Sequence, residues 1–246
     1  MRRYFLSYTW SLSLLMCLGG PAKADVVITG TRVVYPANAR DVSIKLTNGG
    51  AKPALVQAWV DTGDPSQLPE QSDAPFVLTP PVSRVDPNKG QTLRLMFTGA
   101  ELPQNKESLY WLNVLEVPPA TAGEAAENEL QLAFRSRIKI FYRPANLPGL
   151  SIEAAKQLRW RLVPAAGGWA LECSNPTPYY ISLVSAGITV GGRVHSSKQG
   201  GMVSPGGQTN FSLSDLLVKP GADTQVDFTA INDYGGVETH KKKLEQ

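Results

Sequence analysis

The residue types that carry enzymatic chemistry are scarce in this sequence. Its 246 residues include two histidines, His195 and His240. His195 lies in a turn-like segment rich in Gly, Ser and Lys, and His240 opens a basic C-terminal tail that we expect to be solvated and frayed. A Ser/His/Asp triad meets only in the fold, but no Gly-x-Ser-x-Gly pattern supports one. Clustered metal ligands and a phosphate-binding glycine loop are missing from the sequence as well. This inventory favours a binding protein, with no catalytic metal and no cofactor, over an enzyme.

The most informative arrangement of charge is the segment Leu130–Pro144, LQLAFRSRIKIFYRP. In an extended chain, successive side chains point to opposite faces. One face would carry Leu130, Leu132, Phe134, Ile138, Ile140 and Tyr142, and the other would carry Arg135, Arg137, Lys139 and Arg143. A strand of about fourteen residues, Glu129–Tyr142, would span roughly 45 Å, more than twice the common strand length.

Two interpretations fit such a strand, whose expected hairpin partner is Glu107–Val117. Either the opposite sheet covers its apolar face, or the strand lies at a sheet edge and lends main-chain hydrogen bonds and alternate side chains to a partner. Edge strands are usually blunted by charge, proline or a bulge. The stretch from Leu130 to Phe134 has none of these.

Residues 1–24 have the pattern of a secretory signal peptide. Two arginines precede an apolar run, and an Ala-Lys-Ala sequence offers the small residues of a cleavage site before Asp25. The arginine pair also resembles a twin-arginine export signal. Cys17 could mark lipid attachment, although Met16 before it is bulkier than that cleavage site accepts. We expect ordinary secretion and a mature chain that starts at Asp25.

Removal of this segment changes the charge of the chain. It takes Arg2, Arg3 and Lys23 from 24 basic residues, and the remaining 21 equal the 21 acidic residues. A neutral mature chain argues against a nucleic-acid surface, and no later segment is apolar for the length of a membrane helix. Cys173 then stands alone, which excludes a disulfide framework and favours a small buried side chain. We expect a soluble product beyond the inner membrane.

The rest of the sequence is a succession of short strand patterns. Alternating apolar residues mark the strands, and segments rich in Gly and Pro separate them. The strand patterns are 41–46, 54–61, 92–97 and 108–117 in the first half, and 158–163, 168–173, 179–190, 209–214 and 224–233 in the second. Turns spaced by about 8–15 residues predict all-β sandwiches. After the signal peptide, a Pro/Gly-rich linker near 143–150 divides the chain into domains 25–144 and 145–246.

Six segments together resemble a known family. They are TRVVYP (31–36), TPPVSRVDP (79–87), ESLYWLNVLEVPP (107–119), LQLAFRSRIKIFYRP (130–144), NPTPYYISL (175–183) and INDYGG (231–236). In this order they are similar to the periplasmic PapD-like chaperones of the chaperone–usher pathway, over nearly the whole mature chain. The resemblance implies an all-β fold of two immunoglobulin-like β-sandwich domains in an L shape with an interdomain cleft.

The function that the resemblance implies is that of a periplasmic chaperone, not an enzyme. Such a chaperone binds, folds and caps pilus (fimbrial) subunits by donor-strand complementation and delivers them to an outer-membrane usher. The resemblance implies no ATP and no other cofactor, in line with the absence of a metal site and of a nucleic-acid surface expected from the residues. The free chaperone could also self-associate through its exposed donor edge.

The resemblance also assigns roles to individual residues. The two basic residues that anchor the C-terminal carboxylate of the subunit match Arg32 and Lys139. The apolar residues of the donor strand match Leu130, Leu132 and Phe134. The charge network that fixes the angle between the domains matches Glu107, Arg143 and Asp233.

The segment before the donor strand separates branches of this family. Here PPATAGEAAENE is short and lacks the cysteine pair of the long-loop branch, so the chain resembles the short-loop branch. Two other protein classes stay open. A secreted structural or adhesive sandwich would need an N-terminal donor extension, whereas a strand pattern begins almost at Asp25. A sandwich enzyme or copper-handling protein would need a cluster of His, Met or Cys.

Overall fold

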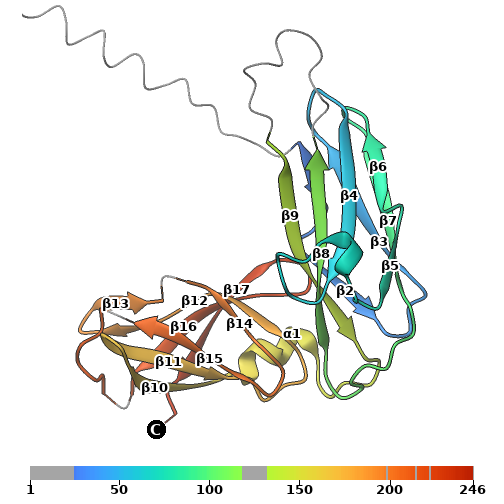
Figure 1. The fold of residues 1–246 in the computed structure, drawn as a ribbon. Coiled ribbons are helices and arrows are strands. Elements are labelled where there is room, and N and C mark those ends of the chain that lie inside the picture. Colours follow the sequence, from blue (N-terminus) through green and yellow to red (C-terminus); the bar gives the residue numbers. More distant parts are fainter. Residues whose placement is uncertain (1–24, 118–131, 198, 214, 222, 246) are drawn as a thin grey trace, which may run out of the picture.

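The two halves of the chain fold into two β-sandwiches set at an angle to each other, which gives the molecule the shape of an L (Figure 1). This computed structural model describes residues 25–117, 132–197, 199–213, 215–221 and 223–245. The signal peptide predicted for residues 1–24 and the segment that separates the branches of the family (118–129) lie outside the described residues.

The first sandwich contains nine strands. They are β1 (Val26–Ile28), β2 (Arg32–Pro36), β3 (Val42–Asn48), β4 (Ala54–Asp61), β5 (Phe76–Thr79), β6 (Val82–Val85), β7 (Gly90–Phe97), β8 (Ser108–Val117) and β9 (Phe134–Arg143), with a short 3₁₀ helix, η2 (Pro69–Gln71). One sheet has the order β1-β3-β7-β5 and the other has the order β2-β9-β8-β4-β6.

Alternating apolar residues build the core between these two sheets. In β3, for example, Ile44 and Leu46 are buried while Ser43, Lys45 and Thr47 are exposed. Leu93 and Leu95 of β7 meet them from the neighbouring strand and are fully buried. A period of two is what a sheet with one buried face requires. The expected strands 54–61, 92–97 and 108–117 lie within strands of the structure, and the expected strand 41–46 matches β3 except for its first residue.

Strand β9 is shorter than the sequence pattern predicts. It spans ten residues, Phe134–Arg143, so the expectation of a strand that starts at Glu129 is wrong for the described residues Leu132 and Ala133. The reason is the partner strand: β8 ends at Val117, and its pairing with β9 reaches Glu116 opposite Phe134. Two prolines follow β8 in the sequence, and proline cannot donate to a strand ladder.

Only half of β9 is paired on both sides. The antiparallel pairing with β8 covers Phe134–Tyr142, but the parallel pairing with β2 covers only Lys139–Arg143. Among the described residues, no strand pairs with the outer edge of Phe134–Ile138. This open edge lies on the side of the first sandwich that faces the angle of the L (Figure 1).

The second sandwich contains eight strands. They are β10 (Arg159–Ala165), β11 (Gly168–Ser174), β12 (Ile181–Val190), β13 (Arg193–Ser196), β14 (Gly201–Val203), β15 (Gln208–Leu213), β16 (Gln225–Ile231) and β17 (Val237–Lys243). Its sheets have the orders β10-β11-β15 and β13-β12-β16-β17, with β14 also paired to β12. Between the sandwiches the chain runs from the end of β9 to the helical turns α1 (Ser151–Ala154) and η4 (Ala155–Gln157).

The core of the second sandwich is built around Trp160. Its ring centroid lies 5.8 Å from that of Phe211 and 5.0 Å from that of Phe228. Cys173 is fully buried in the same core. Burial raises the pKa of its thiol to about 12. Cys173 is therefore a packed apolar side chain and not a reactive thiolate.

Both histidines lie in strands, and the expectation of a frayed tail around His240 is wrong. His240 lies in β17, which pairs with β16 over its whole length, and its ring stacks on Phe228 at 5.2 Å. His195 lies in β13 and is buried, with Nδ1 3.1 Å from Asp215 Oδ2. The sequence of the tail is polar because β17 is an edge strand, where lysines hinder pairing with other chains.

Candidate functional site: two cations at the junction of the sandwiches

Arg32 and Lys139 lie side by side where the two sandwiches meet. Arg32 is the first residue of β2, and the parallel register of β2 and β9 pairs it directly with Lys139. The next residues, Val33 and Ile140, are buried in the core of the first sandwich. Because side chains alternate along a strand, both cations point away from that core, toward the second sandwich.

Each cation reaches an oxygen atom of the second sandwich. Arg32 Nη1 donates to the carbonyl oxygen of Ile231 at 3.1 Å, and Lys139 Nζ donates to Ser182 Oγ at 3.0 Å. Ser182 and Ile231 are themselves register partners on β12 and β16. A pair of neighbouring cations on one sandwich therefore faces a pair of neighbouring acceptors on the other.

The two cations are partly buried and raise each other's electrostatic energy. Burial lowers the pKa of Arg32, although the charge of Asp233 opposes the shift. Burial also lowers the pKa of Lys139, and the positive charge of Arg32 lowers it further. Within the described part of the chain, neither cation forms an ion pair, and Arg32 Nε is buried without a hydrogen-bond partner.

An anion between these side chains would relieve both costs. A carboxylate accepts charge-assisted hydrogen bonds from guanidinium and ammonium groups, and its charge stabilises the protonated forms that burial disfavours. Arg32 and Lys139 also lie 5.9 Å and 5.6 Å from the rings of Phe141 and Trp111. The rings limit where the two side chains can move, so the pair is suited to hold a single carboxylate in a defined position.

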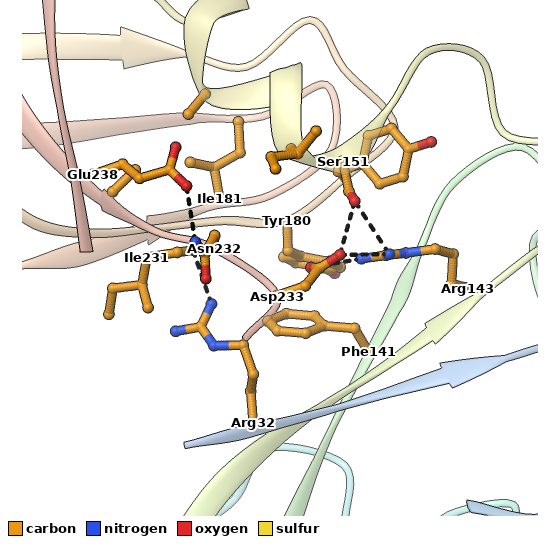
Figure 2. Close-up of a pocket in the computed structure, with 14 residues that line it drawn as sticks. Arg32, Phe141, Arg143, Ser151, Tyr180, Ile181, Ile231, Asn232, Asp233 and Glu238 are labelled. Atoms are coloured by element: carbon orange, nitrogen blue, oxygen red, sulfur yellow. Dashed lines mark hydrogen bonds and ion pairs between the residues drawn. The ribbon is translucent and has the colours of Figure 1, made fainter. Parts of the chain in front are cut away.

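The residues expected to form an interdomain charge network, Glu107, Arg143 and Asp233, are brought together. Figure 2 shows the part of the network that Arg143 forms with Asp233 and Ser151. Arg143, the last residue of β9, donates from Nε to Glu107 Oε1 at 2.7 Å. Its two terminal nitrogens donate to the two carboxylate oxygens of Asp233 at 2.7 Å and 2.9 Å. Asp233 follows β16 in the second sandwich and also accepts a hydrogen bond from Ser151 Oγ at 2.8 Å.

Burial and pairing act against each other in this network. Burial raises the pKa of Glu107, although Arg143 and the N–H of Tyr180, which donates to Oε2 at 2.7 Å, oppose the shift. Burial alone would lower the pKa of Arg143, but its bonds to Asp233 and the charge of Glu107 raise it. Burial would raise the pKa of Asp233, but its hydrogen bonds from Arg143 and Ser151 lower it.

A small cavity of about 30 Å³ lies between the sandwiches at this network. Figure 2 shows residues that line it from both sandwiches, including Arg32 and Phe141 of the first and Tyr180, Ile231 and Asp233 of the second. This volume is about that of one water molecule, so the cavity is too small for a peptide segment. A binding partner would lie along the open surface beside the cations.

The donor-strand residues occupy different environments. Leu132 lies before β9 with 52% of its surface exposed, and Phe134 opens the strand and is half-buried. Leu130 lies outside the described residues. Further along the same face, Ile138 packs against the core of the first sandwich. In the described part of the chain, the opposite sheet thus covers the middle of this apolar face, while Leu132 is left exposed.

Two family models match the chain and together cover most of it. Residues 25–148 match the pili and flagellar-assembly chaperone model, PapD N-terminal domain, and residues 153–242 match the pili assembly chaperone PapD model, C-terminal domain. The chain belongs to the PapD family of pili assembly chaperones. This is a family of chaperones and not of enzymes.

Relatives of this chaperone are similar over nearly their whole length. The chaperone protein FimB/FhaD of Bordetella pertussis is 42% identical over 236 residues, which cover 94% of this chain and 93% of the relative. The crystal structure of the YadV chaperone matches with a TM-score of 0.78 and 40% identity, over 90% of this chain and 100% of that one. The SafB chaperone of Salmonella enterica, solved in complex with the SafA pilin, matches with a TM-score of 0.73 and 29% identity, over 92% and 99% of the two chains.

Sequence reasoning missed a second polar cluster of the chaperone. Asp61 and Asn113 are fully buried in β4 and β8, where they contact arginines of β9. A sequence signal for this cluster was available. Asp61 ends the mostly apolar strand pattern ALVQAWVD, and Asn113 lies in the middle of the mostly apolar pattern SLYWLNVLEV. Ser182 and Ile231, which accept hydrogen bonds from the two cations, were also missed, because only the fold brings them to the first sandwich.

Neither a metal site nor a membrane span is found in the described ranges. They contain no group of three or more His, Cys, Asp or Glu side chains placed to hold a metal ion. They also contain no helix that is long and apolar enough to cross a membrane.

Proposed function

We propose that this chaperone binds pilus subunits by donor-strand complementation, with Arg32 and Lys139 as the anchor for the C-terminal carboxylate of the subunit. The observation that carries the proposal is the placement of the two cations. They lie at the inner end of the open edge of β9, at the point where the pairing with β2 stops. An incoming strand that pairs with this edge would end with its carboxylate between Arg32 and Lys139.

The spacing along β9 supports a defined register for the subunit. From Lys139 to Phe134 is five residues, and to Leu132 seven, which correspond to about 17 Å and 23 Å of extended chain. With the carboxylate held at one end, Phe134, Leu132 and Leu130 would enter the groove of the subunit at fixed positions. A slip of one residue would turn all three to the wrong face.

The chaperone would complete the fold of a subunit, cap its groove against premature polymerisation, and deliver it to an outer-membrane usher. The structure of SafB with a pilin supports a subunit as the partner of a related chaperone. Release requires no ATP in this mechanism, because the extension of the next subunit replaces the lent strand and completes the fold.

We infer that the mature chaperone is periplasmic and begins at Asp25, after cleavage of a signal peptide. The support is the charge and hydropathy pattern of residues 1–24 and the membership of the chain in a family of periplasmic pilus chaperones. N-terminal sequencing of the protein purified from the periplasm tests the cleavage site. A mature protein that keeps residues 1–24 would contradict this inference.

The carboxylate anchor can be tested by co-expression with a pilus subunit encoded beside this gene. Arg32→Ala and Lys139→Ala should each reduce the soluble subunit recovered with tagged chaperone by at least about tenfold, since each removes one charged hydrogen-bond donor. Arg84→Ala is a matched control, because Arg84 is an exposed arginine of the same domain that pairs only with exposed Asp86. If both anchor variants recover as much subunit as the control, the anchor assignment is wrong.

A further inference from the structure

A buried polar network lies on the sheet that contains the donor strand, away from the interdomain junction. Its centre is Asp61, the last residue of β4, whose side chain is completely buried. Asp61 accepts hydrogen bonds from Asn113 Nδ2 at 2.6 Å, from the N–H of Gly63 at 2.7 Å, and from Arg137 Nε at 3.1 Å and Nη2 at 2.5 Å. The carboxylate thus uses both oxygens, and β8 and β9 each contribute a donor.

A second arginine of β9 extends the network. Arg135 donates from Nε and Nη2 to Asn113 Oδ1 at 2.9 Å and 2.6 Å, and from Nη1 to the carbonyl oxygen of Pro65 at 2.6 Å. Asn113 is fully buried, so its amide joins the two arginines through one hydrogen-bonded path. The side chains of β9 therefore reach across β8 and contact β4 and the loop that follows it.

Two tryptophans alternate with the basic side chains. The guanidinium of Arg135 lies 4.7 Å from the ring of Trp59, and that of Arg137 lies 4.2 Å from the ring of Trp111. The ammonium of Lys139 lies 5.6 Å from the same ring of Trp111. A continuous row of cation–π contacts thus connects the start of β9 to the anchor lysine. We call these residues the lateral ladder: Trp59, Asp61, Trp111, Asn113, Arg135 and Arg137.

The lateral ladder coincides with the open edge. Arg135 and Arg137 lie within Phe134–Ile138, the part of β9 that β2 does not cover. A strand paired on one side has few contacts to oppose fraying. The bonds of the ladder run sideways across the sheet and replace the support that a second neighbouring strand would give.

We propose that Asp61 is a positioning residue for donor-strand complementation: through the lateral ladder it holds the half of β9 that β2 does not cover extended and in register before a subunit binds. This inference rests on the proposed function and deepens it. A strand that is already extended loses less conformational freedom on binding, so more of the contact energy remains as affinity. Selecting one register is the best attested role of buried charge pairs.

The network is ill-suited to a purely stabilising role. A buried ion pair is a weak source of stability, because the cost of removing both charges from water offsets most of their attraction. Both arginines of the lateral ladder lie on β9, whereas β4 and β8 supply the groups that contact them. The hydrogen bonds of the ladder therefore hold this one strand. That strand is the one proposed to be lent to the subunit.

Asp61→Asn tests the proposal, with Val85→Ala as the matched control. Val85 is buried in β6, at the opposite edge of the same sheet, so its truncation weakens the domain without touching β9. The first readout is amide hydrogen exchange of Phe134–Ile138 in the free chaperone. In Asp61→Asn, the protection of the β9 amides that are hydrogen-bonded to β8 should fall by more than the loss in the free energy of global unfolding explains. In Val85→Ala, their protection should fall only as far as that loss of global stability explains.

The second readout is the rate at which a urea-unfolded pilus subunit, diluted into excess chaperone, forms the complex. We expect Asp61→Asn to slow this step by roughly tenfold or more relative to Val85→Ala. Arg137→Lys keeps the positive charge but loses the two-nitrogen hydrogen bonding to Asp61 and the planar stacking on Trp111. It should show a smaller loss of β9 protection and a smaller decrease in the capture rate. This variant keeps the test decisive if Asp61→Asn does not fold.

The outcomes separate this inference from the proposed function. Equal exchange and equal capture rates for Asp61→Asn and Val85→Ala at equal stability would overturn the positioning role and leave the donor strand intact. Failure of the wild-type chaperone to capture subunit would contradict the proposed function, while the exchange experiment would still report whether the ladder holds β9. A local loss of protection together with slowed capture supports both.

Discussion

At the scale of single residues, the site places two positive charges close together in a partly buried position. Arg32 and Lys139 are neighbours of like charge, and burial lowers the pKa of each. Their hydrogen bonds go to neutral oxygens of Ile231 and Ser182. A free protein selected only for stability would place a carboxylate or an apolar side chain here. The electrostatic cost in the free chaperone becomes a gain when a carboxylate arrives.

Lys139→Met should therefore separate stability from function. Methionine has a similar length and removes the partly buried charge, so we expect the free energy of unfolding of the free chaperone to rise by about 1 kcal/mol. Subunit capture should be lost at the same time. Urea unfolding and co-purification of subunit measure the two effects, and a variant that loses both stability and capture would contradict this account of the site.

The affinity for subunit should also depend on alkaline pH. The pKa of Lys139 is lowered from its usual value by burial and by Arg32, so the ammonium of the free chaperone is lost at a lower pH than that of an exposed lysine. Because binding needs the charged form, affinity should be constant near neutral pH and should fall as pH rises through this lowered pKa. Lys139→Arg should remove the decline within that range. Titration of binding between about pH 7 and pH 10.5 compares the two, and parallel curves would exclude Lys139 as the source.

At the scale of the element, the proposed function gives β9 three roles that follow one another along the strand. Phe134 lies at its start, Lys139 of the proposed anchor lies in its second half, and Arg143 at its end contacts Asp233 of the second sandwich. The unpaired edge over Phe134–Ile138 would be an aggregation hazard in most proteins. Its retention here is consistent with an edge that is used for pairing.

Leu132→Asp should abolish capture of subunit while leaving the chaperone folded. Leu132 is exposed in the free protein, so a charge there costs little stability, but the same charge would be buried without a partner in the groove of a subunit. Val194→Asp is the matched control, because Val194 is an exposed valine of β13 in the second sandwich. Thermal unfolding and co-purification are the measurements. Capture that survives in Leu132→Asp as well as in the control would rule out the donor segment.

At the scale of the whole molecule, the angle between the sandwiches decides whether one partner can contact both. Arg143 holds a carboxylate from each sandwich, Glu107 and Asp233, and the side chain of Glu107 is almost completely buried. The N–H of Glu107 also donates to the carbonyl oxygen of Pro178, and the ring of Phe141 packs on that of Tyr180 at 5.9 Å. These contacts support one arrangement of the two domains.

Arg143→Ala should loosen that arrangement and destabilise the protein. The buried carboxylate of Glu107 would lose its cation, which typically costs about 3–5 kcal/mol. Small-angle scattering should show a broader distribution of shapes, and urea unfolding should show the lost stability. In contrast, Arg84→Ala removes an exposed pair and should change neither quantity measurably. A compact, fully stable Arg143→Ala would show that the network does not hold the domains.

The sequence by itself determined the strands and the family, because a period of two in buried strands and short motifs in a fixed order are local properties of the chain. It did not determine where β9 begins, because that depends on where β8 stops offering partners. It also misjudged His240, since the polar residues of an edge strand look like those of a tail. The pairing of Arg32 with Lys139 rests on contacts between residues about a hundred positions apart. Only the tertiary structure decided those contacts, and only it showed that Asp61 reaches β9, because burial and register are set by neighbours that the local sequence does not contain.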